Sequence, residues 1–321
     1  MTPSLALRAP APRSPIHPAA PPTLSVLVPA YNAAATIGEA LESALSQTPA
    51  PLEVVVSDDG SEDDLSRILI PFGTHVRVVR GPNGGLAVAR NRAAAVARGE
   101  LLGLLDADDV WLPGRVAALT GALAARPDLA VVTTDAWVSR EGVREASTYY
   151  ATRTFPVEDQ DRHILDANFV FGAGAVRRDV FWAVGGYDPA ARWAEDWDLW
   201  LRLLLRGHLA GLVTVPLYEY RRSGTSLTGQ RVDLARGVLR VLERAAPLLD
   251  DRPRREALAR TQARWRAVAA RAAEASGDPR RRRLAAAVAV GRGASTRERA
   301  RFLAAAAAPD GAWRRLRGLP A

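Results

Sequence analysis

Short apolar runs alternate with segments of helical spacing along the first half of the chain. The apolar runs lie at residues 24–28, 52–56, 76–79, 101–105 and 130–133, and each has the length of a buried strand. Between them, apolar positions recur at the intervals of an amphipathic helix in residues 36–46, 63–70, 86–98 and 113–125. Strands that alternate with helices predict an α/β fold, with a mostly parallel sheet flanked by helices on both faces.

Composition divides the chain into three parts. Residues 1–22 are rich in Pro and Ala and show no apolar periodicity, so we expect a flexible leader. Residues 23–230 carry the strand and helix pattern and form the predicted α/β domain. Residues 231–321 are rich in Ala, Arg and Leu at helical spacing, with breaks at Pro253, Gly277-Asp278-Pro279 and Pro309. This last part is predicted to be a helical C-terminal extension.

The overall composition is that of a folded globular protein, with 48% hydrophobic and 24% charged residues. The chain has no cysteine, which excludes disulfides, thiolate metal sites and a cysteine nucleophile. No run approaches the roughly 20 apolar residues of a membrane-spanning helix, and residues 1–22 lack the apolar segment of a signal peptide. We therefore expect a cytoplasmic protein.

Positive charge is concentrated in the predicted extension. The chain has a net charge of +8, and residues 231–321 hold 22 Arg against 9 acidic residues, a balance of +13. This region is interpreted first as a solvated helical face, because the whole chain uses Arg and never Lys. The second interpretation is a peripheral contact with an anionic lipid surface, at the inner face of the membrane. No nucleic-acid partner is expected.

Polar residues follow three of the predicted strands. Strand ends of a parallel sheet meet at one edge, where such sheets bind their ligands. The segment Asp106-Ala107-Asp108-Asp109 follows the fourth strand, and carboxylates gathered there favour a hard divalent cation, Mg²⁺ or Mn²⁺. Such a cation also binds substrate phosphates, which predicts a diphosphate substrate. Taken alone, the same segment is equally typical of a capped, solvated turn.

Three further segments have both a binding and an ordinary structural interpretation. Asp58, within Ser57-Asp58-Asp59-Gly60-Ser61, is placed to accept a hydrogen bond from a base or ribose, or to form a turn. Pro29-Ala30-Tyr31-Asn32 is placed to wall a nucleotide pocket, or to be a strand-to-helix loop. The glycines of Gly81-Pro82-Asn83-Gly84-Gly85 permit close backbone approach to a ligand, and Arg90 follows one turn into the next helix.

Together, in this order, these motifs resemble those of the family-2 inverting glycosyltransferases of GT-A fold, over residues 24–227. The resemblance implies that Pro29, Ala30, Tyr31 and Asn32 line the nucleotide pocket and that Asp58 contacts the base. It implies that Gly85 and Arg90 lie near the donor, that Asp106 and Ala107 face the ribose and diphosphate, and that Asp108 is the direct metal ligand. Asp109 is expected to be structural.

The acceptor side of the site is expected around residues 193–200. Under the resemblance, Asp196 is the catalytic base, and Trp193, Glu195 and Trp197 are acceptor-side candidates. From the residues alone, acidic side chains at a helix start are also explained by the helix dipole, and tryptophans at helical spacing by packing. Arg221 and Arg222 are candidates for the diphosphate, and a solvated pair is the other interpretation.

The expected reaction is transfer of a sugar from a nucleotide-diphosphate donor, a UDP-sugar by expectation, to the hydroxyl of a glycan or lipid-linked acceptor, in bacterial surface glycan or glycolipid synthesis. One displacement with Asp196 as base inverts the anomeric centre. The chain lacks the Gln-x-x-Arg-Trp motif of processive synthases, so we expect a non-processive, hexosyltransferase-type enzyme. The alternatives are a nucleotide-sugar nucleotidyltransferase and a non-catalytic basic binding protein.

Overall fold

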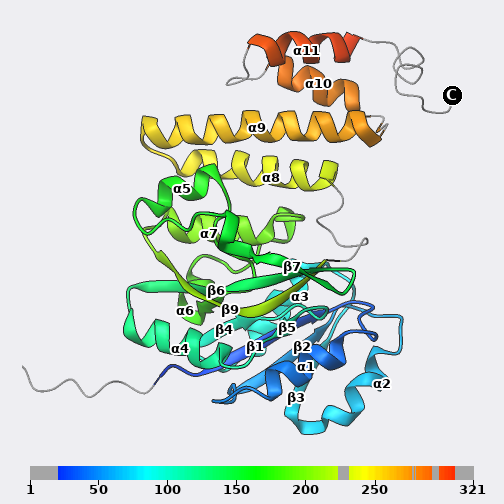
Figure 1. Ribbon diagram of the computed structural model, residues 1–321, viewed down its shortest axis with the longest axis vertical. Helices are drawn as coiled ribbons and strands as arrows, with labels where there is room; N and C mark the ends of the chain where they lie inside the picture. The colour runs from blue at the N-terminus through cyan, green and yellow to red at the C-terminus, as the bar shows by residue number, and fades with distance from the viewer. Residues whose placement is uncertain (1–20, 223–230, 277, 279, 291–295, 308–321) are drawn as a thin grey trace, which may run out of the picture.

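The computed structural model of the chain describes residues 21–222, 231–276, 278, 280–290 and 296–307 (Figure 1). Most of the predicted leader, Gly277, Pro279 and Pro309 lie outside the described residues. The strands are β1 (Leu24–Ala30), β2 (Glu53–Asp58), β3 (Val76–Arg80), β4 (Leu101–Leu104), β5 (Val110–Trp111), β6 (Leu129–Arg140), β7 (Val143–Thr148), β8 (Ala175–Arg177) and β9 (Leu209–Arg222). The helices are α1 (Ile37–Leu45), α2 (Leu65–Leu69), α3 (Leu86–Val96), α4 (Arg115–Ala125), α5 (Gln160–Asp166), α6 (Arg178–Ala183), α7 (Glu195–Leu204), α8 (Arg231–Ala245), α9 (Arg252–Ser276), α10 (Arg281–Val290) and α11 (Thr296–Ala307).

The described strands form one sheet with the order β3-β2-β1-β4-β8-β6-β9-β5, and β7 pairs with β6 outside this path. Strands β3, β2, β1 and β4 are parallel, as the alternating pattern predicts. Beyond β4 the sheet is mixed, because β8 runs antiparallel to both β4 and β6 while β9 runs parallel to β6. The predicted α/β fold is confirmed, although only β3, β2, β1 and β4 form a continuous run of parallel strands.

Strands β1, β2 and β4 are buried on both faces, which explains their continuous apolar runs. Along β1, Val26 and Val28 pack with α1 and α4 on one face, whereas Leu27 points to the other face, towards α3 and α7. This alternation follows from the two-residue period of a strand. The helices therefore cover both faces of this part of the sheet (Figure 1), and the parallel strands end at one edge.

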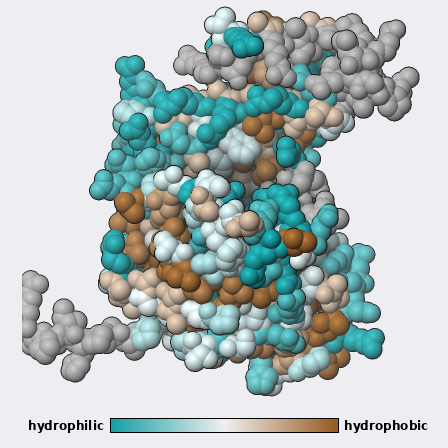
Figure 2. All heavy atoms as spheres, in the orientation of Figure 1, coloured by the Kyte–Doolittle hydropathy of each residue, from teal (hydrophilic) through white to brown (hydrophobic). Residues whose placement is uncertain are grey.

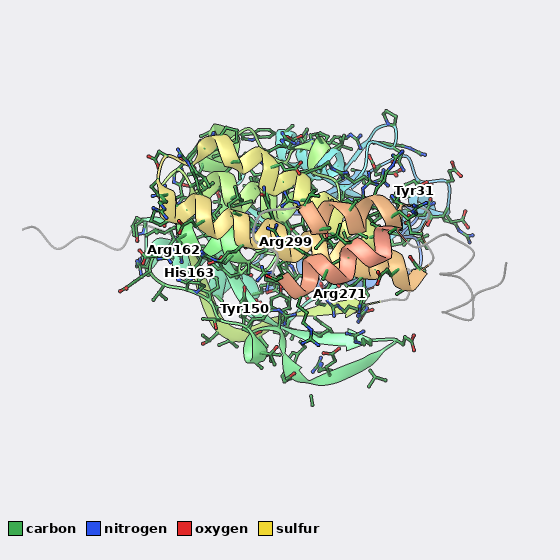
Figure 3. The ribbon with its side chains drawn as sticks, turned by 90° about the horizontal axis from the view of Figure 1, so that it is seen from above. Tyr31, Tyr150, Arg162, His163, Arg271 and Arg299 are labelled. Atoms are coloured by element: carbon green, nitrogen blue, oxygen red, sulfur yellow. The ribbon has the colours of Figure 1, made fainter. Side chains whose placement is uncertain are left out.

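The C-terminal helices continue this arrangement as stacked layers above α7 (Figure 1). Val238 and Val241 of α8 and Leu258 of α9 belong to the same apolar core as α7, whereas Phe302 of α11 packs in a small separate cluster with α9 and α10. Figure 3, seen from above, shows α10 and α11 lying across this end of the molecule. The domain boundary after residue 230 stays a prediction, and α8 and α9 beyond it share the main core.

The outer face of the C-terminal layers is hydrophilic where it is visible in Figure 2. On α9 the exposed positions include Arg252, Arg255, Arg260 and Arg271. Within the described part of the chain, no helix combines the length and the apolar character needed to cross a membrane.

Candidate active site

The end of β1 is tied to the loop that follows β2. The backbone N–H of Asn32 donates to Ser61 Oγ at 3.0 Å, and Asn32 Oδ1 accepts from the Glu62 N–H at 2.9 Å. Asn32 adopts a φ of 49°, a left-handed conformation that Asn tolerates better than most residues. Its side chain thus ties the end of β1 to the loop after β2. Tyr31, beside it, is 49% exposed and lies at the rim of the molecule (Figure 3).

Within β1, Pro29 and Ala30 pair with Ser57 and Asp58 of β2, so their backbones lie at the same edge of the sheet. The carboxylate of Asp58 is buried. Its Oδ1 accepts from the Ser61 N–H at 2.8 Å, and its Oδ2 lies 3.3 Å from Arg80 Nε. Both contacts hold the Asp58 carboxylate in place, at the position where a contact with the nucleotide base is predicted.

Asp59 organises the glycine loop before α3. Its carboxylate accepts from the backbone N–H groups of Gly84 at 3.1 Å and Gly85 at 2.7 Å, and it pairs with Arg92 Nη1 at 3.2 Å. Arg92 also donates to the carbonyl oxygens of Asp58 and Pro82. This role of Asp59 was not predicted from the sequence, because Gly84 and Arg92 lie 25 and 33 positions away along the chain.

Arg90 joins the end of β4 to the start of α7. It is only 4% exposed, and its Nη2 lies 2.8 Å from Asp106 Oδ1 while its Nη1 lies 3.4 Å from Glu195 Oε1. The guanidinium also lies over the ring of Tyr187, 5.3 Å from its centroid. Burial alone would lower the pKa of Arg90, but Asp106, Tyr187 and Glu195 outweigh burial and hold that pKa above its ordinary range. Arg90 is therefore a permanent cation between two carboxylates.

Asp108 reaches the surface at the end of β4, next to Asp106. Partial desolvation and the neighbouring Asp106 carboxylate raise the pKa of Asp108 to about 6. A carboxylate held near another carboxylate is the oxygen donor that Mg²⁺ or Mn²⁺ prefers, so these side chains fit such a cation. Among the described residues, however, no three acidic or imidazole side chains gather into a closed metal site. A cation here needs further oxygen ligands, which a diphosphate supplies.

Asp109 holds the neighbouring strands together. Its Oδ2 accepts from the Tyr218 hydroxyl at 2.7 Å, and its Oδ1 accepts from the Arg221 N–H at 2.7 Å. Burial, together with Asp106 and Asp108, raises the pKa of Asp109 well above its ordinary value. The Tyr218 hydroxyl in turn accepts from the Asp106 N–H at 3.4 Å. These contacts suit the structural part expected of Asp109, since they anchor the loop that carries Asp106 and Asp108.

Asp196 lies at the first turn of α7. Its Oδ2 accepts from Asn168 Nδ2 at 3.0 Å, and its Oδ1 accepts from the Trp197 N–H at 2.7 Å. A Cβ at Gly172 would lie 3.1 Å from Asp196 Oδ2, so the chain passes close to the carboxylate there. Burial is the main cause of a raised pKa for Asp196, although Arg90 and Asn168 act to lower it. Asn168 is a site residue that the sequence analysis missed, because nothing in its local sequence marks it.

The two acceptor-side tryptophans occupy different environments. Trp197 is buried, its indole N–H donates to the Ile164 carbonyl at 2.8 Å, and its ring packs against Trp265. This geometry corrects the predicted acceptor contact of Trp197, because neither face nor edge is open to a sugar. Trp193 precedes the helix with a φ of 81° and stays partly exposed, so it does not share a helical face with Trp197.

Arg221 and Arg222 point in different directions, as neighbours on a strand do. Arg221 forms a two-pronged ion pair with Glu39 of α1, with both N–O distances 2.6 Å. Arg222 lies over the ring of Tyr220, 5.4 Å from its centroid, and its Nε is buried without a hydrogen-bond partner in the described part of the chain. Thus the Arg221 side chain is paired with α1, and that of Arg222 lies against Tyr220.

An aromatic cluster lies beside Asp196. The rings of Tyr149 and Phe171 are 4.7 Å apart, Phe171 is 5.7 Å from Tyr220, and Arg153 lies over Tyr149. Burial and the nearby Asp196 raise the pKa of Tyr149, whereas Arg153 lowers it. Tyr149 comes from the segment between β7 and α5, whose shape the sequence does not predict.

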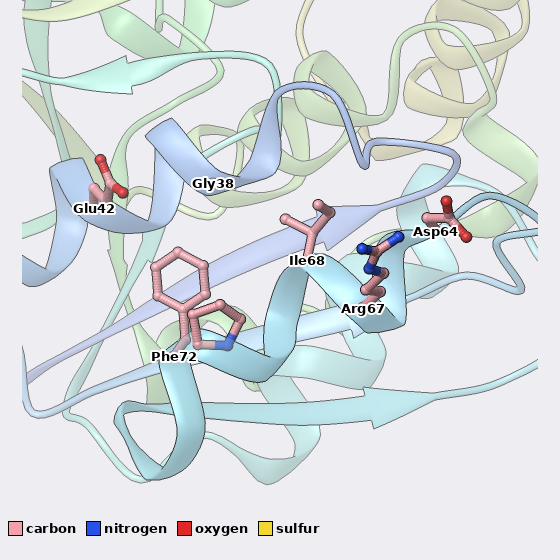
Figure 4. A pocket seen from close by; sticks show the side chains of 7 residues that line it. Gly38, Glu42, Asp64, Arg67, Ile68 and Phe72 are labelled. Atoms are coloured by element: carbon pink, nitrogen blue, oxygen red, sulfur yellow. The ribbon is translucent and has the colours of Figure 1, made fainter.

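A separate hollow of about 460 Å³ lies between α1 and α2 (Figure 4). It is lined by Gly38 and Glu42 of α1 and by Arg67, Ile68 and Phe72 from α2 and the turn after it. None of the residues predicted to bind the donor, the metal or the acceptor lines this hollow.

The mixed α/β fold is shared with known proteins, and comparison with them identifies the class of enzyme. Residues 25–185, half of the chain, match the model of glycosyl transferase family 2, and the chain belongs to this family. The match favours glycosyl transfer over the nucleotidyltransferase interpretation.

Among relatives, an uncharacterised glycosyltransferase of Haemophilus influenzae is 32% identical over 56% of this chain and 62% of its own length. Chondroitin synthase of Escherichia coli is 32% identical over 57% of this chain and 26% of its own length. The match thus spans less than two thirds of each of these relatives.

Solved structures with the same GT-A fold include residues 1–349 of S. aureus TarS in complex with UDP-GlcNAc, with a TM-score of 0.61, 17% identity and coverage of 92% of both chains. The mannosyltransferase PcManGT of Pyrobaculum calidifontis, in complex with GDP-Man and Mn²⁺, has a TM-score of 0.56 and 23% identity, and the match covers 90% of this chain and 87% of that one. The high coverage extends the likeness into the C-terminal helical region.

Proposed function

We propose that the protein is a metal-dependent, inverting, non-processive glycosyltransferase that moves a sugar from a nucleotide-diphosphate donor to an acceptor hydroxyl. The observation that carries the proposal is the bridge formed by Arg90, which brings Asp106 at the end of β4 and Glu195 at the start of α7 to one point. The carboxylate of Asp106, on the donor side, and that of Glu195, next to the proposed catalytic base, are 89 residues apart in the chain. The bridge brings them into one site.

On the donor side, we assign the nucleotide to the edge formed by Pro29, Ala30, Tyr31, Asn32 and Asp58. Gly85, Arg90, Asp106 and Ala107 are assigned to the ribose and diphosphate. A divalent cation, Mn²⁺ or Mg²⁺, held by Asp108 and the donor phosphates would neutralise the charge that develops on the leaving diphosphate. The role of Asp108 is supported by its exposed position beside Asp106.

On the acceptor side, Asp196 takes the proton of the attacking hydroxyl while the bond to the anomeric carbon forms. Its raised pKa suits this role, because a base with a pKa closer to the working pH accepts a proton more readily. Asn168 holds the carboxylate by one oxygen. One attack from the face opposite the leaving group inverts the anomeric centre, and Arg222 is proposed to face the diphosphate or the acceptor.

The donor is proposed to be a UDP-sugar, by analogy with the UDP-GlcNAc complex of TarS. The acceptor is proposed to be a glycan or a lipid-linked glycan of the bacterial surface, which is supported by relatives named as chondroitin synthase and as succinoglycan biosynthesis protein ExoU. We propose a cytoplasmic location with peripheral membrane contact through the basic helices.

The experiment is to incubate the purified protein with UDP-, GDP- and dTDP-sugars and Mn²⁺, and to measure nucleoside diphosphate release. Asp196→Asn should slow release by about 100- to 10,000-fold. In Asp108→Asn, Mn²⁺ should no longer stimulate release, so the rate with Mn²⁺ should fall to the rate measured without it. Asp250→Asn is the matched control, since its side chain is 88% exposed on the connection between α8 and α9. Pyrophosphate formation in place of nucleoside diphosphate release would contradict the proposal.

A further inference from the structure

The segment that leads into α7 has an unusual backbone. Trp193 adopts a φ of 81°, a region that bulky side chains rarely enter. Such a conformation persists only where the surrounding structure holds it. Asp196 lies three residues further on, at the first turn of α7, so a rotation about the backbone of Trp193 would move the start of that helix.

Helix α8 contacts this segment at Gly237. A Cβ built at Gly237 would lie 2.6 Å from the Arg192 carbonyl oxygen and 2.8 Å from Trp193 Cβ, which is closer than real Cβ contacts allow. Only glycine therefore lets α8 approach the backbone before α7 as closely as it does. The contact falls on the strained residue itself and on the one before it.

A second contact joins the same two parts two helical turns further along α8. Arg244 forms an ion pair with Asp188, whose carboxylate also accepts from the Ala190 N–H at 2.8 Å. Residues seven apart lie on one face of a helix, so Gly237 and Arg244 act on the segment from the same side. Val238 and Val241, on the adjoining face, are buried in the core with α7. This packing limits how far α8 can shift away from the segment.

We propose that α8 is a positioning element of the active site, in which Gly237 and Arg244 hold the residues 188–194 in the conformation that sets Asp196. This gives the first helix of the C-terminal region a part in acceptor activation. The catalytic consequence rests on the proposed function, whereas the packing of α8 against the segment does not. Gly237 and Arg244 are positioning residues and touch no substrate.

The test compares Gly237→Ala with Gly121→Ala. Both glycines lie in helices, and a Cβ at Gly121 meets nothing within 4 Å. Since Ala favours a helix over Gly, Gly121→Ala should raise the melting temperature. Gly237→Ala should instead lower it, and amide hydrogen exchange of residues 188–196 should become faster in Gly237→Ala but not in Gly121→Ala. Arg244→Gln, which adds no bulk, should produce the same local increase in exchange.

Kinetics provide the second measurement, with water or a sugar as acceptor. In Gly237→Ala, kcat should fall by about 10- to 100-fold, as expected for a displaced base, while the KM for the donor stays unchanged. Melting and exchange in Gly237→Ala and Arg244→Gln that match those of Gly121→Ala would overturn the proposal. If the wild-type protein turns over no donor, the proposed function fails, and the exchange measurement still decides the role of α8.

Discussion

Replacement of Asp59 tests how strongly one carboxylate organises the donor loop. In Asp59→Ala, the backbone N–H groups of Gly84 and Gly85 lose their acceptor, and Arg92 loses its ion-pair partner. The Asp59 side chain is 4% exposed and that of Arg92 20%, so water replaces these contacts only in part. Hydrogen bonds to a charged group contribute about 1.5–3 kcal/mol each, and removal of one partner of a buried pair costs about 3–5 kcal/mol.

We therefore expect the free energy of unfolding to fall by about 3–5 kcal/mol in Asp59→Ala. The matched control is Asp128→Ala, because the pair between Asp128 and Arg126 is exposed, with side-chain exposures of 47% and 59%. Exposed pairs contribute about 0–1 kcal/mol, so the control should stay close to the wild type.

The assay is thermal unfolding of both variants, followed by circular dichroism. For a domain of 150–250 residues each kcal/mol shifts the midpoint by about 2–4 °C, so Asp59→Ala should melt at least about 6 °C below the wild type. Donor binding should weaken as well, because the loop of Gly84 and Gly85 loses its anchor. Equal midpoints for Asp59→Ala and Asp128→Ala would refute the assigned role of Asp59.

Further outcomes follow from the acceptor side. Burial raises the pKa of Asp196, and a base must be deprotonated to act. In a plot of kcat/KM against pH, the acid limb should therefore lie above the pKa of an ordinary aspartate, near 3.9. A limb at or below that pH would exclude Asp196 as the base. Arg90 lowers the pKa of Asp196, so Arg90→Gln should move this limb to still higher pH, and an unchanged profile would contradict the bridge. Trp197→Phe should lower stability through the lost hydrogen bond to Ile164, with the KM for the acceptor unchanged, and a selective rise in that KM would restore Trp197 to the acceptor side.

Strands β1 to β4 and helices α1 to α4 could be predicted because local periodicity determines them, whereas the two-residue strand β5 was not predicted. Both faces of β1 and β2 are buried, which makes their apolar runs continuous. The antiparallel β8 and the long β9 could not be placed, because strand order depends on contacts between distant segments. For the same reason, the sharing of one core by α7 and α8 was not predicted.

Within the site, the sequence singled out Asp106, Asp196 and Arg90 without showing that Arg90 joins the two sides. The ion pairs of Arg90 depend on the packing of α3 against the end of β4 and the start of α7. For Trp197, helical spacing predicts which residues share a helix face. It does not predict whether that face is buried or open to a ligand.

The most direct test of the central claim is a donor-release measurement on Asp196→Asn beside the wild type, at saturating Mn²⁺ and nucleotide sugar. The account predicts nucleoside diphosphate release by the wild type, a loss of about 100-fold or more in the variant, and unchanged donor affinity by calorimetry. Full turnover by Asp196→Asn would contradict the assignment of the base, and the absence of turnover and of donor binding in the wild type would contradict glycosyl transfer itself.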